Sequence, residues 1–190
     1  MQSDIELMLR TRAGDDSAYS ELMRRHYKGV VNYIYRFTNM RDNSEDLAQE
    51  VFFRVYRSAR NWKPEAKFST WLYKIATNVC LTHLKGRRRN LSLDEIEETK
   101  GDVQDAGVDI TDDIIYRKEM KDVIFKALES LPEREKIAIM LCKYEGFSYE
   151  EVSEVLECTV GAVKAYVHRG RMKLIDQLEP YLGQGGDYGV

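Results

Sequence analysis

Apolar residues recur every three or four positions along nearly the whole chain, and no stretch shows convincing strand alternation. The clearest example follows Ser44, where Leu47, Val51 and Val55 stand at four-residue intervals. Because an α-helix completes a turn in about 3.6 residues, this spacing puts the apolar side chains on one face. The pattern predicts an all-α protein, with helices over residues 5–13, 17–38 (capped by Asp16, with a break near Gly29), 42 or 44 to 60, 69–85, 114–131, 132–146, 148–156 and from 159 onward.

Two capped helices joined by a tight turn are predicted near the end of the chain. Ser148, with Glu151 three residues later, forms a capping box, and Thr159 is placed to cap the helix that follows. The second helix keeps its apolar residues on one side and carries basic residues elsewhere. A helix-turn-helix presents a basic helix to the DNA major groove in this way. Taken alone, the pattern fits an ordinary pair of capped helices equally well.

The helical parts are separated by a segment of different character, which is acidic, contains Gly101 and Gly107 and shows no sustained apolar period. The end of the chain is rich in glycine, which is typical of a frayed tail. We therefore expect two small helical domains joined by an acidic linker: 1–90, the linker 91–113, 114–182 and a flexible tail 183–190.

Charge is unevenly distributed although the net charge is only −3. Residues 54–90 contain ten basic residues and one acidic residue, whereas residues 91–122 contain eleven acidic residues and four basic ones. The net charge by itself argues against nucleic-acid binding. Its distribution reverses that argument, because a basic block followed by an acidic connector implies separate partners for separate surfaces.

Several classes of protein are disfavoured by the sequence. No apolar run approaches the length that spans a bilayer, and the N-terminus lacks a secretory signal, so we expect a cytoplasmic protein without membrane insertion. The cysteines are odd in number and widely spaced, which favours buried core residues over disulfides or a zinc site: Cys80, Cys142 and Cys158. No phosphate-binding glycine loop, nucleophile elbow or paired-carboxylate arrangement is present, so we predict no catalytic activity, no cofactor and no metal.

A polar patch is expected on the helix that begins near Ser44. Asp46, Gln49 and Glu50 lie opposite its buried stripe, with Phe53 adjacent to them. Acidic residues early in a helix are favoured by the helix dipole, so an ordinary solvated face explains them. The sharper hypothesis is a docking surface for a basic partner helix, with Phe53 as an apolar anchor.

Aromatic and basic residues are interleaved in the next segment, which holds Trp62, Lys63, Lys67, Phe68, Trp71, Tyr73 and Lys74. Bases of single-stranded nucleic acid stack on aromatic rings at about 1–3 kcal/mol each, while lysines hold the phosphates. The alternative is that Phe68 and Trp71 belong to the core. Asn78 is placed either to contact a base edge or to be merely exposed.

In four stretches the chain resembles the bacterial sigma-70 family, specifically its small extracytoplasmic-function (ECF) group. The stretches are RDNSEDLAQEVF at 41–52, FSTWLYKIATN at 68–78, LPERE at 131–135, and the capping box at Ser148 followed by VGAVK at 160–164. Each motif is loose alone, but four in the family's order and separation are highly specific. The resemblance extends from about Ile5 to Leu182.

The resemblance implies a role for each surface. The face that grips the β′ clamp helices of RNA polymerase would hold Asp46, Gln49, Glu50 and Phe53. The −10 element, with a flipped-out base of the non-template strand, would be bound by Asn61, Lys63, Lys67, Phe68, Trp71, Tyr73, Lys74 and Asn78. The −35 element would be contacted in the major groove, and on phosphate, by Lys164, Ala165, His168, Arg169 and Arg171.

The partners implied by the resemblance are core RNA polymerase through its β′ and β subunits, promoter DNA and an anti-sigma factor. The acidic linker would thread toward the polymerase active centre. The chain departs from the family's usual Thr, Ser and Arg at Ala162, Ala165 and Tyr166, and from a turn glycine at Glu157, so no particular −35 sequence is inferred. The rival hypothesis is a free-standing helix-turn-helix regulator, which leaves the patch at Asp46 and the aromatic segment without a role.

Overall fold

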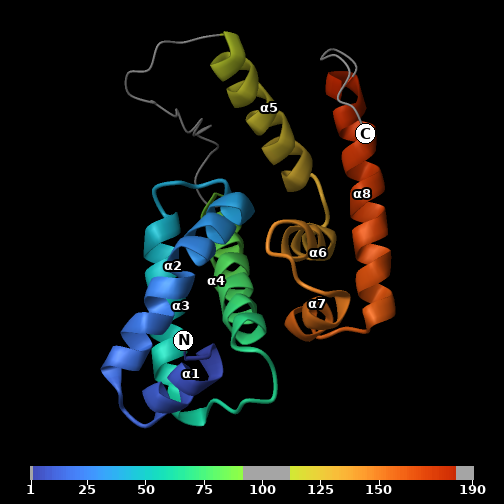
Figure 1. Cartoon of the computed structure of the whole chain (residues 1–190). Helices are drawn as coiled ribbons and strands as arrows, with labels where there is room; N and C mark the ends of the chain where they lie inside the picture. The colour runs from blue at the N-terminus through green and yellow to red at the C-terminus, as the bar shows by residue number, and fades with distance from the viewer. Residues whose placement is uncertain (1, 92–111, 183–190) are drawn as a thin grey trace.

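The computed structural model describes residues 2–91 and 112–182, and every regular element in both parts is helical, as predicted (Figure 1). The elements are α1 (Asp4–Arg12), α2 (Asp16–Thr38), α3 (Ser44–Ser58), the short 3-10 turn η1 (Ala59–Asn61), α4 (Phe68–Leu91), α5 (Asp112–Glu129), α6 (Glu133–Lys143), α7 (Tyr149–Leu156) and α8 (Val160–Leu182). The predicted linker and glycine-rich tail fall almost wholly at 92–111 and 183–190, which lie outside the described residues.

Helices α1 to α4 pack around one core, with α2 in contact with each of the other three. The apolar stripe predicted for α3 is buried at Val51 and Val55, and Ala48 and Phe52 widen it. The facing helices contribute fully buried side chains at Leu7, Met8, Leu22, Ile34, Phe37 and Leu72. Burial of these stripes is the main driving force for packing short helices that are individually marginal in water.

Local corrections to the predicted helices have simple causes. The carboxylate of Asp15, and not that of Asp16, caps α2 by accepting hydrogen bonds from the backbone N–H groups of Ser17 and Ala18. Helix α2 is continuous through Gly29, with no break. The glycine permits α2 and α4 to approach closely, because a Cβ there would lie 3.1 Å from the Tyr73 hydroxyl oxygen of α4. Helix α4 does not stop at residue 85 and continues through the basic residues to Leu91.

Helices α5 to α8 form the second domain, in which α8 packs on α5, α6 and α7. The predicted capping box is present, since the Ser148 hydroxyl accepts from the Glu151 N–H and the Glu151 carboxylate accepts from the Ser148 N–H. The Thr159 hydroxyl accepts from the N–H of Ala162 and caps α8. Glu157 has a left-handed φ of 51°, so the turn between α7 and α8 forms without the family's usual glycine.

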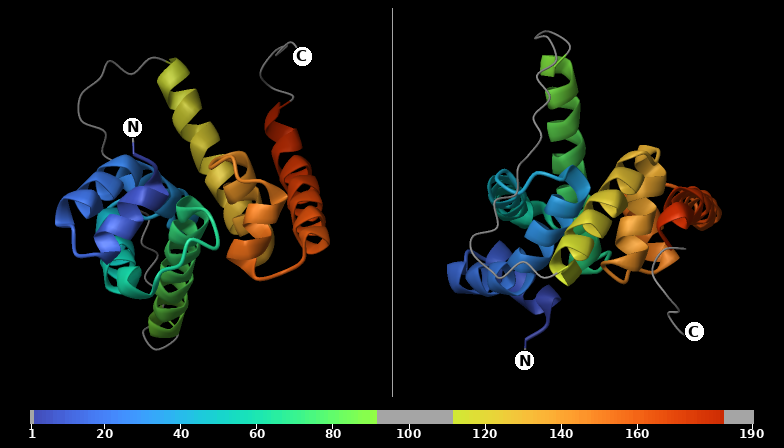
Figure 2. Two further views of the ribbon diagram at one scale, coloured as in Figure 1. Left: turned by 60° about the horizontal axis from the view of Figure 1, so that its bottom comes forward. Right: turned by 90° about the horizontal axis from the view of Figure 1, so that it is seen from above.

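The two domains pack directly against each other, which the sequence did not predict. Figure 2 shows α1–α4 side by side with α5–α8, and the contacts between them join α7 to α4 and α6 to α2. The buried apolar residues of both domains form one continuous cluster. The arrangement is therefore a closed pair of domains and not two bodies separated by a tether.

Candidate nucleic-acid and protein interfaces

The polar patch on α3 faces solvent, as predicted. Asp46, Gln49, Glu50 and Phe53 are all exposed, and the Phe53 ring keeps 54% of its surface accessible. The buried stripe on the opposite side of α3 fixes this orientation. The only ion pair of the patch joins Glu50 to Arg54 of the same helix, at 2.7 Å, so within the described part of the chain the Asp46 carboxylate has no cationic partner. The patch is available to another molecule.

A pocket of about 360 Å³ lies between the end of α3, the turn η1 and α4. It brings together Asn61 and Asn78, two residues that the sequence assigned to one surface. Its remaining walls are Arg54, Arg57, Ser58 and Ile75. The two arginines belong to the basic block at 54–90, but the block gave no sign that they share a pocket with the asparagines. The amide groups can hydrogen-bond to a base, the guanidinium groups can bind a phosphate, and the Ile75 side chain offers apolar contact. The set therefore suits a nucleotide, in which a base adjoins a phosphate.

Most of the aromatic segment lies in the core, so the alternative stated for Phe68 is the one that the structure supports. Phe68 is 2% exposed and packs between the rings of His26 and Trp71, which leaves it no free face for a base in this conformation. Tyr73 is 6% exposed. Trp71 is partly buried and retains some accessible surface. A direct stacking role thus does not fit Phe68 here, and its ring instead supports Trp71.

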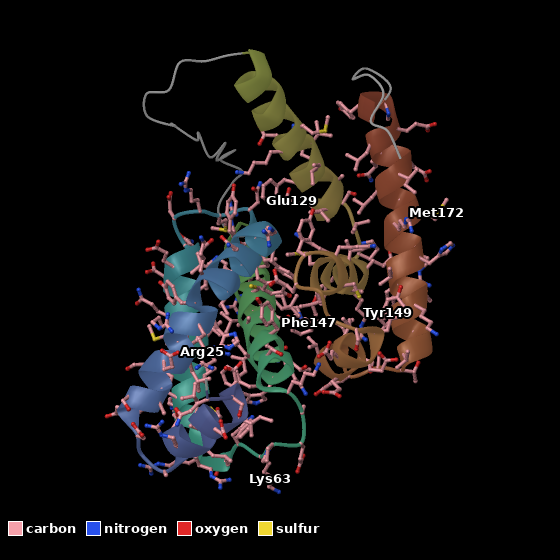
Figure 3. All side chains as sticks on the ribbon, viewed as in Figure 1. Arg25, Lys63, Glu129, Phe147, Tyr149 and Met172 are labelled. Carbon is pink, nitrogen blue, oxygen red and sulfur yellow. The ribbon has the colours of Figure 1, made fainter. Side chains whose placement is uncertain are left out.

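The three lysines predicted to hold phosphates have different surroundings. Lys63 is exposed in the loop before α4 and points away from the helices (Figure 3). Lys67 and Lys74 each form an ion pair with a glutamate of the second domain, Glu151 at 2.8 Å and Glu157 at 2.7 Å. The hydrogen bond that Lys67 donates to the Glu151 carboxylate raises the pKa of Lys67. Two of the three cations are therefore already paired within the chain.

Helix α8 turns an exposed basic surface outward at its N-terminal half. Lys164, His168 and Arg171 are exposed and Ala165 is partly exposed, while Val163 and Val167 anchor the helix in the core. Gly170 allows a close approach to α6, because a Cβ there would lie 3.1 Å from Cγ1 of Ile139. This is the geometry of a recognition helix held by its back.

Arg169 differs from its neighbours because it is tied to α6. Its Nε donates to Oε1 of Glu135 at 2.8 Å, and Lys173 donates to Oε2 at 3.0 Å. The Glu135 side chain is only 6% exposed. Burial by itself raises the pKa of this carboxyl, but hydrogen bonds from Arg169 and Lys173 outweigh burial and the pKa is lowered. The sequence did not single out Glu135, since one acid in a helix gives no sign of burial.

Within residues 2–91 and 112–182, no group of three or more His, Cys, Asp or Glu side chains is placed to hold a metal ion. None of the described helices is long and apolar enough to cross a membrane.

Comparison with known proteins gives concordant matches. The family profile for sigma-70 region 2 matches residues 22–90, and that for sigma-70 region 4 matches residues 121–174. The RNA polymerase sigma-H factor of Pseudomonas aeruginosa is 30% identical over 186 residues, covering 95% of this chain and 96% of that protein. The ECF RNA polymerase sigma-E factor of Haemophilus influenzae is 30% identical over 185 residues, covering 95% and 97%.

Two solved structures share the fold over most of the chain. CnrH, in complex with the cytosolic domain of CnrY, has a TM-score of 0.70 at 22% identity and covers 94% of this chain and 99% of that one. The sigma factor RpoE of Bartonella quintana, in complex with the anti-sigma factor NepR, has a TM-score of 0.65 at 22% identity and covers 85% and 96%. The similarity therefore includes both helical domains.

Proposed function

The chain belongs to the sigma-70 family of RNA polymerase sigma factors, in the ECF group, and we propose that its three surfaces divide the work of promoter recognition. Its function is to direct RNA polymerase to promoters. The proposal concerns which residues perform each part, and it places the chain in the cytoplasm as a non-catalytic subunit. The observation that carries it is the exposure of three chemically distinct surfaces on α3, at the α3–α4 pocket and on α8.

The α3 patch is the proposed docking face for core polymerase. Its carboxylates fit a basic partner, and the exposed rings of Phe53 and Tyr56 add apolar area next to them. Aromatic anchors beside charged groups are characteristic of protein interfaces, in which a few side chains carry most of the binding energy. The buried stripe of α3 makes this face rigid, so little ordering entropy is lost on binding.

The pocket between α3 and α4 is the proposed site for a base of the −10 element. Asparagine amides donate to and accept from base edges, while Arg54 and Arg57, which line the same pocket, attract phosphates. Asn61 and Asn78 both line this pocket, so a base that enters it lies near both amides. In this assignment the asparagines distinguish one base from another, and the arginines raise the affinity for the DNA strand.

Helix α8 is the proposed −35 element reader. Lys164 and His168 are one turn apart on its outer face, and Ala165 offers a small apolar surface beside them. The methyl of an alanine contacts the thymine methyl group, whereas cations contact guanine or phosphate. Arg171, one turn further from the N-terminus, is placed for a phosphate.

Two partners are proposed beyond DNA. Core polymerase would be contacted through β′ at the α3 patch and through β by the second domain. An anti-sigma factor is proposed because the fold is shared with CnrH and RpoE, whose solved structures hold CnrY and NepR. The free-standing regulator is the weaker candidate, because the family match extends over both domains and not over the helix-turn-helix alone.

The docking assignment is tested by changing Asp46 and Glu50 to Arg. The double variant should lose at least about a hundredfold in affinity for core polymerase, because like charges placed against a basic partner cost several kcal/mol. Both side chains are exposed, so helix content should be unchanged. The graded comparison is Asp46→Asn with Glu50→Gln, which removes the two charges without reversing them and should lose less affinity. Wild-type affinity of the Asp46/Glu50 variant, measured by fluorescence anisotropy, would refute the assignment.

A further inference from the structure

The interface between the two domains covers the first half of α4. Lys67, just before the helix, and Lys74, within it, are seven residues apart and therefore lie on nearly the same face. Helix α7 and its two flanking turns lie against that face. Both lysines belong to the set assigned to the −10 strand, so the second domain occupies part of the proposed DNA surface.

Each of these two lysines forms an ion pair with one glutamate of the second domain. Oε1 of Glu151, at the start of α7, lies 2.8 Å from Nζ of Lys67. Oε1 of Glu157, just after α7, lies 2.7 Å from Nζ of Lys74. The two ends of a single short helix thus place carboxylates where a nucleic-acid strand would place phosphates.

A third contact lies between these pairs. The Tyr73 hydroxyl donates to Oε2 of Glu145 at 2.5 Å, and Arg36 of α2 lies 3.3 Å from the other oxygen of the same carboxylate. The Phe147 ring packs edge-on against Tyr73 with ring centroids 5.1 Å apart, and Figure 3 shows it between α4 and the second domain. Glu145 is 11% exposed, so its charge is largely withdrawn from water and is balanced by these partners.

A fourth contact joins α6 to α2. Nζ of Lys136 donates to the backbone carbonyl oxygen of Phe37 at 2.7 Å, and both residues are buried. This carbonyl lies in the last turn of α2, where a helix has unsatisfied carbonyl groups and favours a cation. The interface therefore combines a buried charge-assisted hydrogen bond with three ion pairs, of which those of Lys67 and Lys74 each have one exposed partner.

From this arrangement we propose that the interface is a self-inhibitory contact in which Glu151 and Glu157 occupy the −10 cations Lys67 and Lys74 until the domains separate. The proposal rests on the function assigned above. The closed chain leaves the α3 patch and the outer face of α8 exposed, so polymerase docking and −35 contact remain possible. What it blocks is the part of the proposed single-strand surface that holds Lys67 and Lys74, and separation of the domains is the step that frees these two cations.

The two lysine–glutamate ion pairs are weak enough to be displaced. The Lys67 side chain is 74% exposed and that of Glu157 is 73% exposed, so each pair has one partner in open solvent. Ion pairs of this kind contribute little individually and are screened by salt. Single-stranded DNA that binds only the open form therefore shifts the population toward it and competes with ion pairs that are already partly solvated.

The test uses the full chain with Glu151→Gln and Glu157→Gln. Glutamine at position 151 keeps the capping box, because an amide oxygen still accepts from the Ser148 N–H, so α7 should fold normally. The matched control is Glu150→Gln with Glu154→Gln, which removes the same charge from exposed positions of α7 that form no interdomain ion pair in the described structure. The comparison separates loss of the contact from a simple change in net charge.

Small-angle scattering of the free chain and anisotropy with a labelled single-stranded DNA of random sequence provide the two readouts. The Glu151/Glu157 variant should show a larger radius of gyration, and its single-strand affinity should exceed that of the control by about threefold to thirtyfold. High salt should expand the wild-type chain and leave the variant unchanged. Identical scattering and affinity in variant and control would overturn the self-inhibitory contact.

A third measurement keeps this result separate from the function itself. Binding of core polymerase by the Glu151/Glu157 variant should match the wild type, because the α3 patch is untouched. If no form of the chain binds core polymerase, the proposed function fails, whereas the opening measured on the free chain stands independently.

Discussion

Glu135 anchors helix α8, and its replacement by Gln is expected to lower the free energy of unfolding of the second domain by about 1–2 kcal/mol. The buried carboxylate accepts charge-assisted hydrogen bonds from Arg169 and Lys173 of α8. Such bonds contribute about 1.5–3 kcal/mol when well buried. The two cations have side chains 50% and 46% exposed, so water recovers part of their interaction and the lower part of that range applies.

Removing the two cationic partners should lower the free energy of unfolding more than removing the Glu135 charge does. Replacing Arg169 and Lys173 by Ala leaves a carboxylate that is only 6% exposed without a cationic partner, and an uncompensated buried charge costs about 3–5 kcal/mol. Adding Glu135→Gln to this double variant removes the stranded charge and should restore stability. The same substitution is thus predicted to destabilise the wild-type chain and to stabilise the variant, which a double-mutant cycle measures directly.

Hydrogen exchange of backbone amides in α6 and α8 is the suitable assay, because it reports the second domain separately from the first. The pH dependence provides a further check. The pKa of Glu135 is lowered from 4.5 in the folded chain, so its contribution is present above about pH 4.5 and is lost as the pH falls through the lowered value. Equal effects of Glu135→Gln in both backgrounds, or an effect that persists in acid, would refute the reasoning.

Three further predictions concern separate surfaces. Changing Lys164 and His168 to Ala should weaken duplex −35 binding by about tenfold or more and spare polymerase binding, since each well-placed base contact contributes about 1–3 kcal/mol; unchanged promoter use would remove α8 from the assignment. Asn78→Ala should raise the dissociation constant for a single-stranded −10 oligonucleotide in holoenzyme with little effect on helix content, which filter binding and circular dichroism check. Burial raises the pKa of Cys80 to about 12, so native alkylation at neutral pH should modify the other two cysteines, and mass spectrometry should find Cys80 labelled only after unfolding.

The helices and caps were predictable because their causes are local. The four-residue apolar interval of α3 fixes which side is buried, and therefore that Asp46 and Glu50 are exposed. Ser148 and Glu151 satisfy each other's backbone within one turn, so their pairing needs no knowledge of the rest of the fold.

The pocket and the aromatic core depend on contacts distant in sequence. Arg57 and Asn78 meet only because α3 and α4 pack together, and no short window of sequence contains both. An interleaved run of aromatic and basic residues does not show which rings face inward, which is why Phe68 and Tyr73 were assigned to DNA although both are buried.

The closed arrangement of the domains was the least predictable feature. Glu151 was recognised as a capping residue, and the same carboxylate also pairs with Lys67 of the other domain. A capping box gives no indication of a second, interdomain role. The position of Lys136 is similar, since its burial depends on a carbonyl at the end of a helix nearly a hundred residues earlier.

Run-off transcription with purified bacterial core polymerase tests the central claim most directly. A library of genomic promoter fragments is transcribed with and without the protein, and start sites are mapped by sequencing the RNA ends. Promoter recognition by this chain predicts new, discrete start sites that require both components and share sequence elements at −10 and −35. Absence of new start sites, together with a shift of duplex DNA by the protein alone, would contradict it.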